Sequence, residues 1–402
     1  MFWHSSVDQA LNNLKKNVHA PVRVVLWDGR EVTLSDEPLV TVRLNGVAAA
    51  PALARPSLLT LAEAYIEGHA DLEGDVREAI RGAEALSRTG TRRMYDDPRN
   101  ARHTKGVDRE SIRHHYDVSN EFYALWLDPR MVYSCAYFRE EGDSLEAAQV
   151  QKLDHICRKL RLAPGERLLD IGCGWGALVI HAAREYGVEA TGITLSENQH
   201  RLANQRIREA GLEGRCRVLL QDYRDHAGEG IYDKVASVGM FEHVGLKNLP
   251  VYFGAAQRLL RDGGLFLNHG ITTCDTASGS VGLGGGEFIG RYVFPNGELP
   301  HLHLVVREMS DAQFEVHDVE GLRPHYAKTL ALWSENFERR FAEAVAASDE
   351  KTARIWRLYL AGCAHAFEQR WVSIYQVLAS KQSSPGRTEL PLTRDWMYPK
   401  PD

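Results

Sequence analysis

The sequence has few cysteines and no pair of them at the Cys-x-x-Cys spacing. The six are scattered along the chain: Cys135, Cys157, Cys173, Cys216, Cys274 and Cys363. This scatter argues against a zinc site and against a framework of disulfides, and it is typical of a protein of the reducing cytoplasm. We therefore expect no metal site.

Long apolar runs are also missing. No run approaches the ~20 apolar residues that span a bilayer. The first residues, MFWHSSVDQALNNLKK, lack the basic segment followed by an apolar one that marks a secretory signal. We expect a protein of the cytoplasm without a membrane span, which can still touch the inner face of the membrane.

An excess of basic charge is absent as well. The chain has 48 Lys and Arg against 54 Asp and Glu, a formal net charge of −6. Such a balance gives no global field that attracts nucleic acid or anionic lipid, so nucleic acid is not an expected partner. Any anionic partner must instead meet a local patch of basic residues.

The length of 402 residues favours two domains, because single cores rarely grow so large. Residues 1–87 contain short strand-like runs with turns at DGR and NG, followed by the helical run LLTLAEAYIEG, which predicts a small lipid-associated α+β domain. Residues 88–113 carry eight basic residues against four acids and lack apolar periodicity. This connector is either a solvated linker or a basic strip that faces phosphate groups.

The third part, residues 114–402, alternates between strand-like and helical runs from Leu168 onward. Five strands are predicted, at RLLDI, VEATGIT, CRVLL, DKVASV and GGLFLNH. Alternation of this length predicts a mostly parallel, Rossmann-like α/β sheet with helices on both faces. The glycine-rich run TASGSVGLGGGEF interrupts the pattern as a mobile lid does, and the tail from Tyr326 to Lys381 is predicted to be mainly helical.

A glycine loop follows the first strand of this sheet, in LLDIGCGWG. Gly172, Gly174 and Gly176 stand between a strand and a helix, where backbone N–H groups can approach a ligand. The alternative is a turn that serves strand–helix packing alone. Together with Asp170, the loop resembles motif I of class I S-adenosylmethionine methyltransferases, whose fold is a seven-stranded sheet.

Several further motifs narrow the resemblance. They are HYDVSNEFYALWLDPRMVYSCAYF (115–138), QDYRD (221–225), VGMFEHVG (238–245), FPNG (294–297) and the late YLAGCAHAFEQR. With EAYIEGHADLEGD near the N-terminus, they make most of the chain similar to cyclopropane-fatty-acyl-phospholipid synthases.

This resemblance implies a set of cofactor contacts and a bound anion. Tyr133, Ser134, Gly172 and Gly174 would border S-adenosylmethionine, Thr194 and Gln199 would take its ribose, and Gln221, Asp222 and Tyr223 would surround its adenine. Thr194 and Gln199 stand where such folds usually place a ribose-binding acid. A bicarbonate ion would be held by backbone groups of Cys135 and Ile271 and by the side chains of Glu242, His269 and Tyr326.

Some of these residues can also be interpreted as purely structural. Cys363 matches a cysteine proposed as an active-site residue in this family, but a cysteine in an apolar helix is usually a small buried hydrophobe, and we favour that role. His269 could be a core histidine. Its position at the end of a strand instead points toward a ligand crevice, as does that of Glu242. His243 is taken as structural.

The chemistry implied by the resemblance defines what the site requires. An isolated cis double bond is a poor nucleophile, and after it attacks an electrophilic methyl group, positive charge lies on the chain. Aromatic faces can stabilise this cation, and Tyr137, Phe138, Phe241 and Trp333 are available. A base must then remove a proton so that the ring closes, either Glu242 itself or the bicarbonate.

The expected function is therefore cyclopropane formation on unsaturated acyl chains of membrane phospholipids, with reversible contact to the membrane surface. The family also suggests a homodimer. Three alternatives stay open: C-methylation of an unsaturated or furan-type chain without ring closure, methylation of a small N or O nucleophile, and a lipid-binding protein with an inactive methyltransferase fold.

Overall fold

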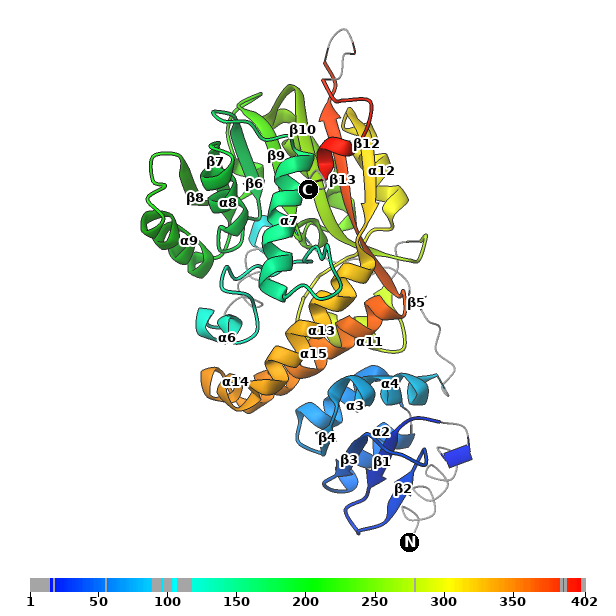
Figure 1. The fold of residues 1–402 in the computed structure, drawn as a ribbon. Coiled ribbons are helices and arrows are strands. Elements are labelled where there is room, and N and C mark those ends of the chain that lie inside the picture. The colour runs from blue at the N-terminus through cyan, green and yellow to red at the C-terminus, as the bar shows by residue number, and fades with distance from the viewer. Residues whose placement is uncertain are drawn as a thin grey trace.

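The chain folds into a small N-terminal domain and a larger body built on a seven-stranded sheet (Figure 1). Helices of the larger body lie between its sheet and the N-terminal domain. The computed structural model describes residues 15–16, 19–54, 56–88, 95–96, 103–106, 118–277, 280–383, 386 and 389–398. Most of the expected connector, including Arg92, Arg93 and Arg99, lies outside the described residues.

The N-terminal domain packs helices against a four-stranded sheet with the strand order β2-β1-β3-β4. Its strands are β1 (Val22–Val25), β2 (Glu31–Thr33), β3 (Val40–Leu44) and β4 (Ala70–Gly74). Its helices are η1 (Val47–Ala49), α2 (Ala50–Ala54), α3 (Leu58–Ile66) and α4 (Val76–Ser87). The first three strands and α3 form where the short alternating runs and the helical run predict them.

Polar caps fix where the two long helices of this domain begin. Ser57 accepts a hydrogen bond from the Thr60 amide at 3.1 Å, and Thr60 Oγ1 in turn accepts from the Ser57 amide at 3.0 Å. Asp75 accepts from the Arg77 amide at 2.8 Å at the start of α4. These contacts satisfy N–H groups that the first turn of a helix leaves unpaired.

The larger sheet has the strand order β12-β13-β10-β9-β6-β7-β8. Its strands are β6 (Arg167–Ile171), β7 (Glu189–Thr194), β8 (Cys216–Leu220), β9 (Tyr232–Val238), β10 (Leu260–Thr273), β12 (Phe314–Gly321) and β13 (Val372–Lys381). Strands β6 to β10 run parallel, whereas β13 is antiparallel to both β10 and β12. The five strands predicted from the sequence are all present, and the predicted fold class is confirmed.

Helices cover both faces of this sheet because consecutive strand residues point to opposite sides. Leu168 packs with helices α7 (Leu145–Lys159), α8 (Ala177–Glu185) and α9 (Glu197–Glu209). Its neighbour Leu169 packs on the other face with α10 (Leu249–Leu259) and α12 (Leu302–Asp311). Strands buried on both faces explain the nearly continuous apolar runs in the sequence.

The tail is helical over α13 (Arg323–Arg339), α14 (Phe341–Ala347) and α15 (Glu350–Glu368), as expected, but its last part forms β13. That strand is buried along almost its whole length, at VSIYQVLASK. The sequence analysis predicted helix for this segment, because a short apolar run has the same pattern in a buried strand as in a buried helix.

The glycine-rich segment forms β11 (Ser280–Val281) and α11 (Gly285–Tyr292). Helix α11 packs against α3, and the Leu58 amide donates to the Leu283 carbonyl at 2.7 Å. The segment therefore joins the larger body to the N-terminal domain. Its mobility as a lid stays a prediction.

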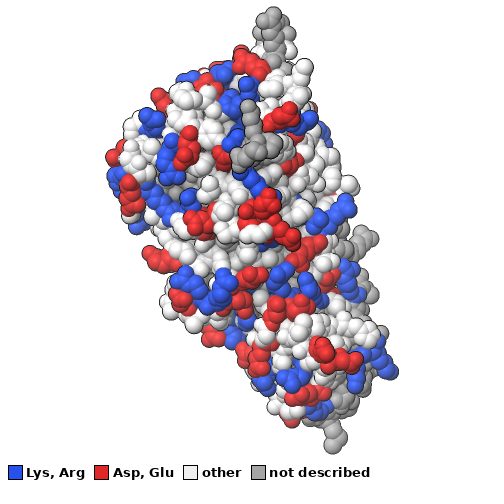
Figure 2. All heavy atoms as spheres, in the orientation of Figure 1, with Lys and Arg blue, Asp and Glu red and all other residues white. Residues whose placement is uncertain are grey.

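Among the described residues, no helix has both the length and the apolar character required to cross a bilayer. On the face shown in Figure 2, basic and acidic side chains are interspersed over both parts of the molecule. This face carries no extended field of one sign, in keeping with the net charge of −6.

Candidate active site

Two cavities meet where the parallel strands β6, β9 and β10 end. The glycine-loop cavity has a volume of ≈ 140 Å³ and includes the turn between β6 and α8. The apolar cavity is larger, at ≈ 600 Å³, and extends from the strand ends toward the N-terminal domain. Four residues line both: Tyr133, Ser134, Gly239 and His243. Ligands in the two cavities would therefore approach each other at these residues.

The glycine loop has the backbone geometry that only glycine adopts easily. Gly172, Gly174 and Gly176 have φ of +80°, +55° and +83°. A Cβ on Gly172 would lie 2.6 Å from Met240 Cγ, whereas a Cβ on Gly174 would meet no atom within 4 Å. Gly174 therefore leaves open space beside the N-terminus of α8, where backbone N–H groups can bind a ligand.

The glycine-loop cavity collects all but one of the residues predicted to bind the cofactor. Its lining includes Tyr133, Ser134, Asp170, Gly172, Gly174, Thr194, Gln199, Gln221 and Tyr223. Asp222 lies outside this lining, because its carboxylate accepts two hydrogen bonds from Arg224 at 2.6 and 2.9 Å. Thr194 and Gln199, the predicted ribose ligands, are hydrogen-bonded to each other at 2.7 Å.

Asp170 and Lys152 place opposite charges beside the glycine loop. Asp170 Oδ1 is buried and has no hydrogen-bond partner among the described residues, and burial raises the pKa of its carboxyl to about 7. Lys152 is buried too, and burial lowers the pKa of its ammonium to about 8. An unpaired carboxylate suits the ammonium group of an amino acid moiety, so the site fits the methionine end of S-adenosylmethionine.

Side chains of α7 and α13 hold the irregular segment of Tyr133 to Phe138. Lys152 Nζ donates to Ser134 Oγ at 2.9 Å, and Gln149 Nε2 donates to the Ser134 carbonyl at 2.9 Å. Thr329 Oγ1 accepts from the Ala136 amide at 3.1 Å. The sequence analysis missed Lys152 and Gln149. Polar residues spaced by three on the buried face of an amphipathic helix were the available signal.

All six residues predicted to act near the reacting methyl group line the apolar cavity: Cys135, Glu242, His269, Ile271, Tyr326 and Cys363. They come from five separate segments of the chain. Glu242 follows β9, and its Oε1 accepts a hydrogen bond from the Ile271 amide of β10 at 2.6 Å. The Ile271 N–H assigned to the anion by resemblance is therefore donated to Glu242 in this structure.

Glu242 and His269 present one unpaired polar atom each. Glu242 Oε2 and His269 Nε2 are buried and lack a hydrogen-bond partner among the described residues. Burial raises the pKa of Glu242 to about 7 and lowers the pKa of His269 well below its ordinary value. At neutral pH the histidine is therefore uncharged, and the glutamic acid is about half protonated.

Two unpaired polar atoms make the pair a candidate ligand site. Gln376 Nε2 lies 3.3 Å from His269 Nδ1. Glu242 Oε1 accepts from Ile271, which leaves Glu242 Oε2 and His269 Nε2 without partners among the described residues. An unsatisfied buried polar group is costly, so a ligand that bonds to both atoms would be favourable.

The two cysteines of the site are poor nucleophiles. Burial raises the pKa of the Cys135 thiol far above its ordinary value, and it raises the pKa of the Cys363 thiol to about 12. Both therefore stay protonated at neutral pH. Cys363 lines the apolar cavity from α15 as an uncharged small side chain.

The aromatic residues of the apolar cavity differ from the four named in the sequence analysis. Tyr137, Phe138, Phe241 and Trp333 are absent from its lining. The rings that line it in the larger body are Tyr133, Phe288, Phe294, Tyr326, Tyr359, Phe367 and Trp371. The sequence could not separate the two groups, because both lie in similar apolar segments. The hydroxyls of Tyr133 and Tyr359 lie 3.0 Å apart, beside the junction of the two cavities.

The sequence analysis assigned His243 a structural role, but in the structure it lies at the junction of the two cavities. It lines both cavities, and its ring lies 5.2 Å from that of Phe294. Phe294 belongs to the FPNG motif, so the second half of the Glu-His pair connects this motif to the strand ends.

Two basic residues of the expected connector are described, and both face acids. Arg88 pairs with Glu84 one turn earlier in α4, and Lys105 pairs with Asp225. The other six lie outside the described residues. The basic strip thus stays a prediction.

Two family models match the chain. One, described as mycolic acid cyclopropane synthetase, matches residues 103–377. The other, described as a domain of unknown function (DUF7884), matches residues 10–90. The first model therefore includes the residues at the strand ends that line the two cavities. The second model includes the four-stranded N-terminal sheet.

Comparison with curated proteins agrees with the first family model. The chain is 50% identical over 384 residues to a probable fatty acid methyltransferase of Pseudomonas putida, covering 95% of this chain and 98% of that protein. It is 40% identical over 269 residues to the cyclopropane-fatty-acyl-phospholipid synthase of Escherichia coli K12, covering 67% of each.

Solved structures resemble the larger body. The mycolic acid cyclopropane synthase CmaA1 complexed with SAH and CTAB is 35% identical, with a TM-score of 0.64, and covers 68% of this chain and 98% of that chain. The cyclopropane synthase MmaA2 of Mycobacterium tuberculosis is 34% identical with the same TM-score and coverage. Coclaurine N-methyltransferase, at 20% identity and a TM-score of 0.62, shows the shared fold alone.

Proposed function

Because the chain belongs to the mycolic acid cyclopropane synthetase family, we propose that it transfers a methylene unit from S-adenosylmethionine to the cis double bond of phospholipid acyl chains, forming a cyclopropane ring. At the coarser level, it is an S-adenosylmethionine-dependent enzyme that modifies lipid acyl chains. The observation that carries the finer proposal is the junction of a glycine-loop cavity and an apolar cavity beside Glu242 and His269.

The residues of the glycine-loop cavity would hold S-adenosylmethionine. When bound, this cofactor supplies an electrophilic methyl group. Asp170 offers its unpaired carboxylate to the amino group, and the open space at Gly174 admits the ligand to the backbone. Tyr133 and Ser134 border both cavities, so they would lie beside the transferred group.

Glu242 and His269 would help to remove the proton that must leave before the ring closes. The alkene carbons form a bond to the methyl group, its bond to sulfur breaks, and one hydrogen of the new methyl group departs as a proton. Bicarbonate would supply the base, and the two unpaired polar atoms are available to bond to it. Tyr326 lines the same cavity and offers a hydroxyl.

The apolar cavity fits a fatty acyl chain. Its lining is mainly aliphatic and aromatic, with few polar groups, and these lie near the strand ends. The related CmaA1 is complexed with SAH and CTAB, which supports occupation of this kind of site by a cofactor product and a long-chain molecule together. An acyl chain gains free energy by leaving water for such a lining.

C-methylation without ring closure is the second candidate. It is favoured by the 50% identity to a protein named only as a probable fatty acid methyltransferase. The two reactions share the attack on the methyl group and differ in where the proton is lost, so Glu242 and His269 would have to direct that loss.

One experiment separates the candidates. The protein is incubated with S-adenosylmethionine and vesicles of monounsaturated phospholipid, and the acyl chains are analysed by mass spectrometry and NMR. A product heavier by one methylene with cyclopropane proton signals supports ring formation. A methyl or methylene branch supports the second candidate, and unmodified chains contradict both.

The enzyme must also reach lipids that reside in a bilayer. We propose that it docks reversibly on the inner membrane surface through the basic residues of segment 88–113. The homodimer suggested by the family is a further proposal, which light scattering of the purified protein would test.

A further inference from the structure

We propose that the N-terminal domain, whose family model is described as a domain of unknown function, is an acyl-chain chamber that receives the methyl-terminal half of the substrate chain. This inference rests on the proposed function, since it assigns a second part of the same substrate to a second part of the same cavity. It gives the domain a binding role inside its own core.

The apolar cavity does not stop at the larger body. It continues between the N-terminal sheet and its helices, and its lining there includes residues of strands β1, β3 and β4 and of helices α3 and α4: Val22, Val24, Val42, Leu44, Leu58, Leu61, Tyr65, Leu72, Ala79, Ile80, Ala83 and Leu86. The same cavity is lined by Glu242 and His269 at its other end. A chain bound at the strand ends therefore has a continuous apolar path into the N-terminal domain.

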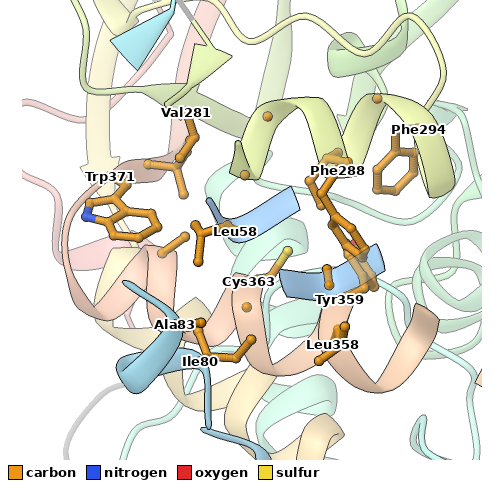
Figure 3. Close-up of a pocket in the computed structure, with 18 of the residues that line it drawn as sticks. Leu58, Ile80, Ala83, Val281, Phe288, Phe294, Leu358, Tyr359, Cys363 and Trp371 are labelled. Carbon is orange, nitrogen blue, oxygen red and sulfur yellow. The ribbon is translucent and has the colours of Figure 1, made fainter. Parts of the chain in front are cut away.

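Small side chains keep this path open where the two parts meet. Helix α4 contributes Ala83, α15 contributes Gly362 and Ala366, and α11 contributes Gly286. Figure 3 shows Ile80 and Ala83 of α4 across the cavity from Cys363 and Leu358 of α15, with α11 along another side.

Polar contacts surround this open centre. Five pairs join the N-terminal domain to α15: Asp71 with Arg354 at 2.9 Å, Glu67 with Lys351 at 2.7 Å, Glu84 with His365 at 2.6 Å, Glu368 with Arg77, and Glu368 with Arg81 at 3.5 Å. Interfaces between domains normally bury apolar side chains at their centre and polar ones at the rim. Here the ion pairs lie along α15, and the cavity runs beside a packed apolar cluster that includes Leu59, Ile66 and Leu360.

The methyl-terminal half is the part of a phospholipid that this chamber can accept. Val22, Val24 and Leu44, deep in the domain, are at most 4% exposed, and the lining there is aliphatic. A charged headgroup would lose its hydration without compensation in such surroundings. The headgroup and carboxyl-side half must then lie toward solvent, with the double bond at the strand ends.

Imperfect packing is the alternative to a chamber. An empty apolar cavity destabilises a protein in proportion to its volume, and the whole cavity, of which the chamber is one part, has a volume of ≈ 600 Å³, within the range of ligand pockets. The alternative predicts that filling the cavity leaves substrate choice unchanged.

Photo-crosslinking tests where the chain lies without depending on turnover. Vesicles carry a phospholipid whose oleoyl chain bears a diazirine on its terminal carbons, and crosslinked peptides are mapped by mass spectrometry. We expect crosslinks in residues 58–66 and 76–87. Crosslinks confined to residues 285–299 and 326–374 would overturn the chamber.

Substitution tests the consequence for specificity. Ala83→Phe places a ring in the passage, while Ala85→Phe adds the same ring to α4 at a position outside the cavity lining. The substrates are palmitoleoyl and gadoleoyl phospholipids, which differ only in length beyond the double bond. We expect Ala83→Phe to lower the gadoleoyl-to-palmitoleoyl rate ratio roughly tenfold or more, and Ala85→Phe to leave it unchanged.

The outcomes separate this inference from the proposed function. A wild-type enzyme that modifies both chains, with an unchanged ratio in Ala83→Phe, retains the proposed function and loses the chamber. A wild-type enzyme that modifies neither chain contradicts the proposed function. In that case, the crosslinking pattern by itself tests whether an acyl chain enters the N-terminal domain.

Discussion

At the scale of single residues, burial shifts the pKa values of Glu242 and His269 in opposite directions. It raises the pKa of Glu242 to about 7 and lowers the pKa of His269 well below its ordinary value. A carboxyl group that is partly protonated at neutral pH repels an anion less than a full carboxylate does. Under the proposed function, this lessens the repulsion between Glu242 and a negatively charged base.

Replacing Glu242 by Gln is expected to lower turnover by ~10²–10⁴, the range typical of lost acid–base help. Gln keeps the size of the side chain, and its oxygen can still accept a hydrogen bond from the Ile271 amide. Unlike a carboxyl group, however, it cannot gain or lose a proton. S-adenosylmethionine affinity, measured by calorimetry, should not change. Glu213→Gln, at an exposed position, is the control. Near-normal ring formation in Glu242→Gln would exclude this residue from proton transfer.

Carbonate depletion tests the anion separately. Enzyme stripped of dissolved carbon dioxide should slow and should recover when bicarbonate returns. Tyr326→Phe removes one hydroxyl from the same cavity and should weaken the response to added bicarbonate. A wild-type rate indifferent to carbonate depletion would assign the base role to a protein group instead.

Glu242 is also expected to make stability depend on pH. Its pKa rises from an ordinary 4.5 to about 7 on folding, so the folded protein binds a proton that the unfolded chain releases. The associated stability is fully present below the unfolded pKa and is lost as pH rises through 7. Glu242→Gln should therefore raise the free energy of unfolding by about 3 kcal/mol near pH 8 but by less than about 1 kcal/mol near pH 5. Equal effects at both pH values in denaturant titrations would contradict this prediction.

The sequence predicts these reactive residues better than it predicts their surroundings. Glu242 follows β9, and His269 lies within β10 opposite Val238, the last residue of β9, so both lie near the edge where the parallel pairing ends. Lys152 and Gln149 were missed because their role comes from contact with an irregular segment, Tyr133 to Phe138, that has no periodic pattern. Asp222 was assigned to the cofactor although its neighbour Arg224 occupies its carboxylate.

At the scale of elements, the turn between β6 and α8 depends on Met240, which follows β9. The Met240 side chain lies against Gly172, so the glycine loop and the Glu-His segment are in direct contact. A change in one is transmitted to the other through this packing.

Gly172→Val is expected to abolish S-adenosylmethionine binding by calorimetry. The added side chain would require both a backbone with φ of +80°, which β-branched residues avoid, and the displacement of Met240. Gly211→Ala is the control, since that glycine has a similar φ of +66° but no atom within 4 Å of its Cβ position. Unchanged affinity in a folded Gly172→Val protein would remove the loop from the cofactor site.

Elements with a clear period were predicted, and elements defined by distant partners were not. The five parallel strands each follow the expected pattern of an apolar run before a loop. Strands β12 and β13 were missed because they pair late in the chain, and β13 is as apolar as the helix before it. Only its pairing with β10, more than a hundred residues earlier, distinguishes the two.

At the scale of the whole molecule, the membrane contact is expected to depend on segment 88–113. Replacing Arg92, Arg93 and Arg99 by Gln should weaken sedimentation with anionic vesicles, and raised salt should weaken the wild type similarly. Replacing the exposed Arg201, Arg208 and Arg215 of the larger body by Gln is the control. If binding is indifferent to both the segment and salt, segment 88–113 is a linker only.

The position of β13 has a consequence for synthesis of the protein on the ribosome. The strand spans residues 372–381, yet it lies between β10 and β12, which are made earlier. Until it emerges, the nascent chain exposes one unpaired edge of β10 and leaves β12 without a strand partner, and such edges promote association with other chains. Translation that stalls or stops before residue 372 would therefore leave an aggregation-prone product rather than a smaller enzyme, and chaperone demand should be greatest in this late interval.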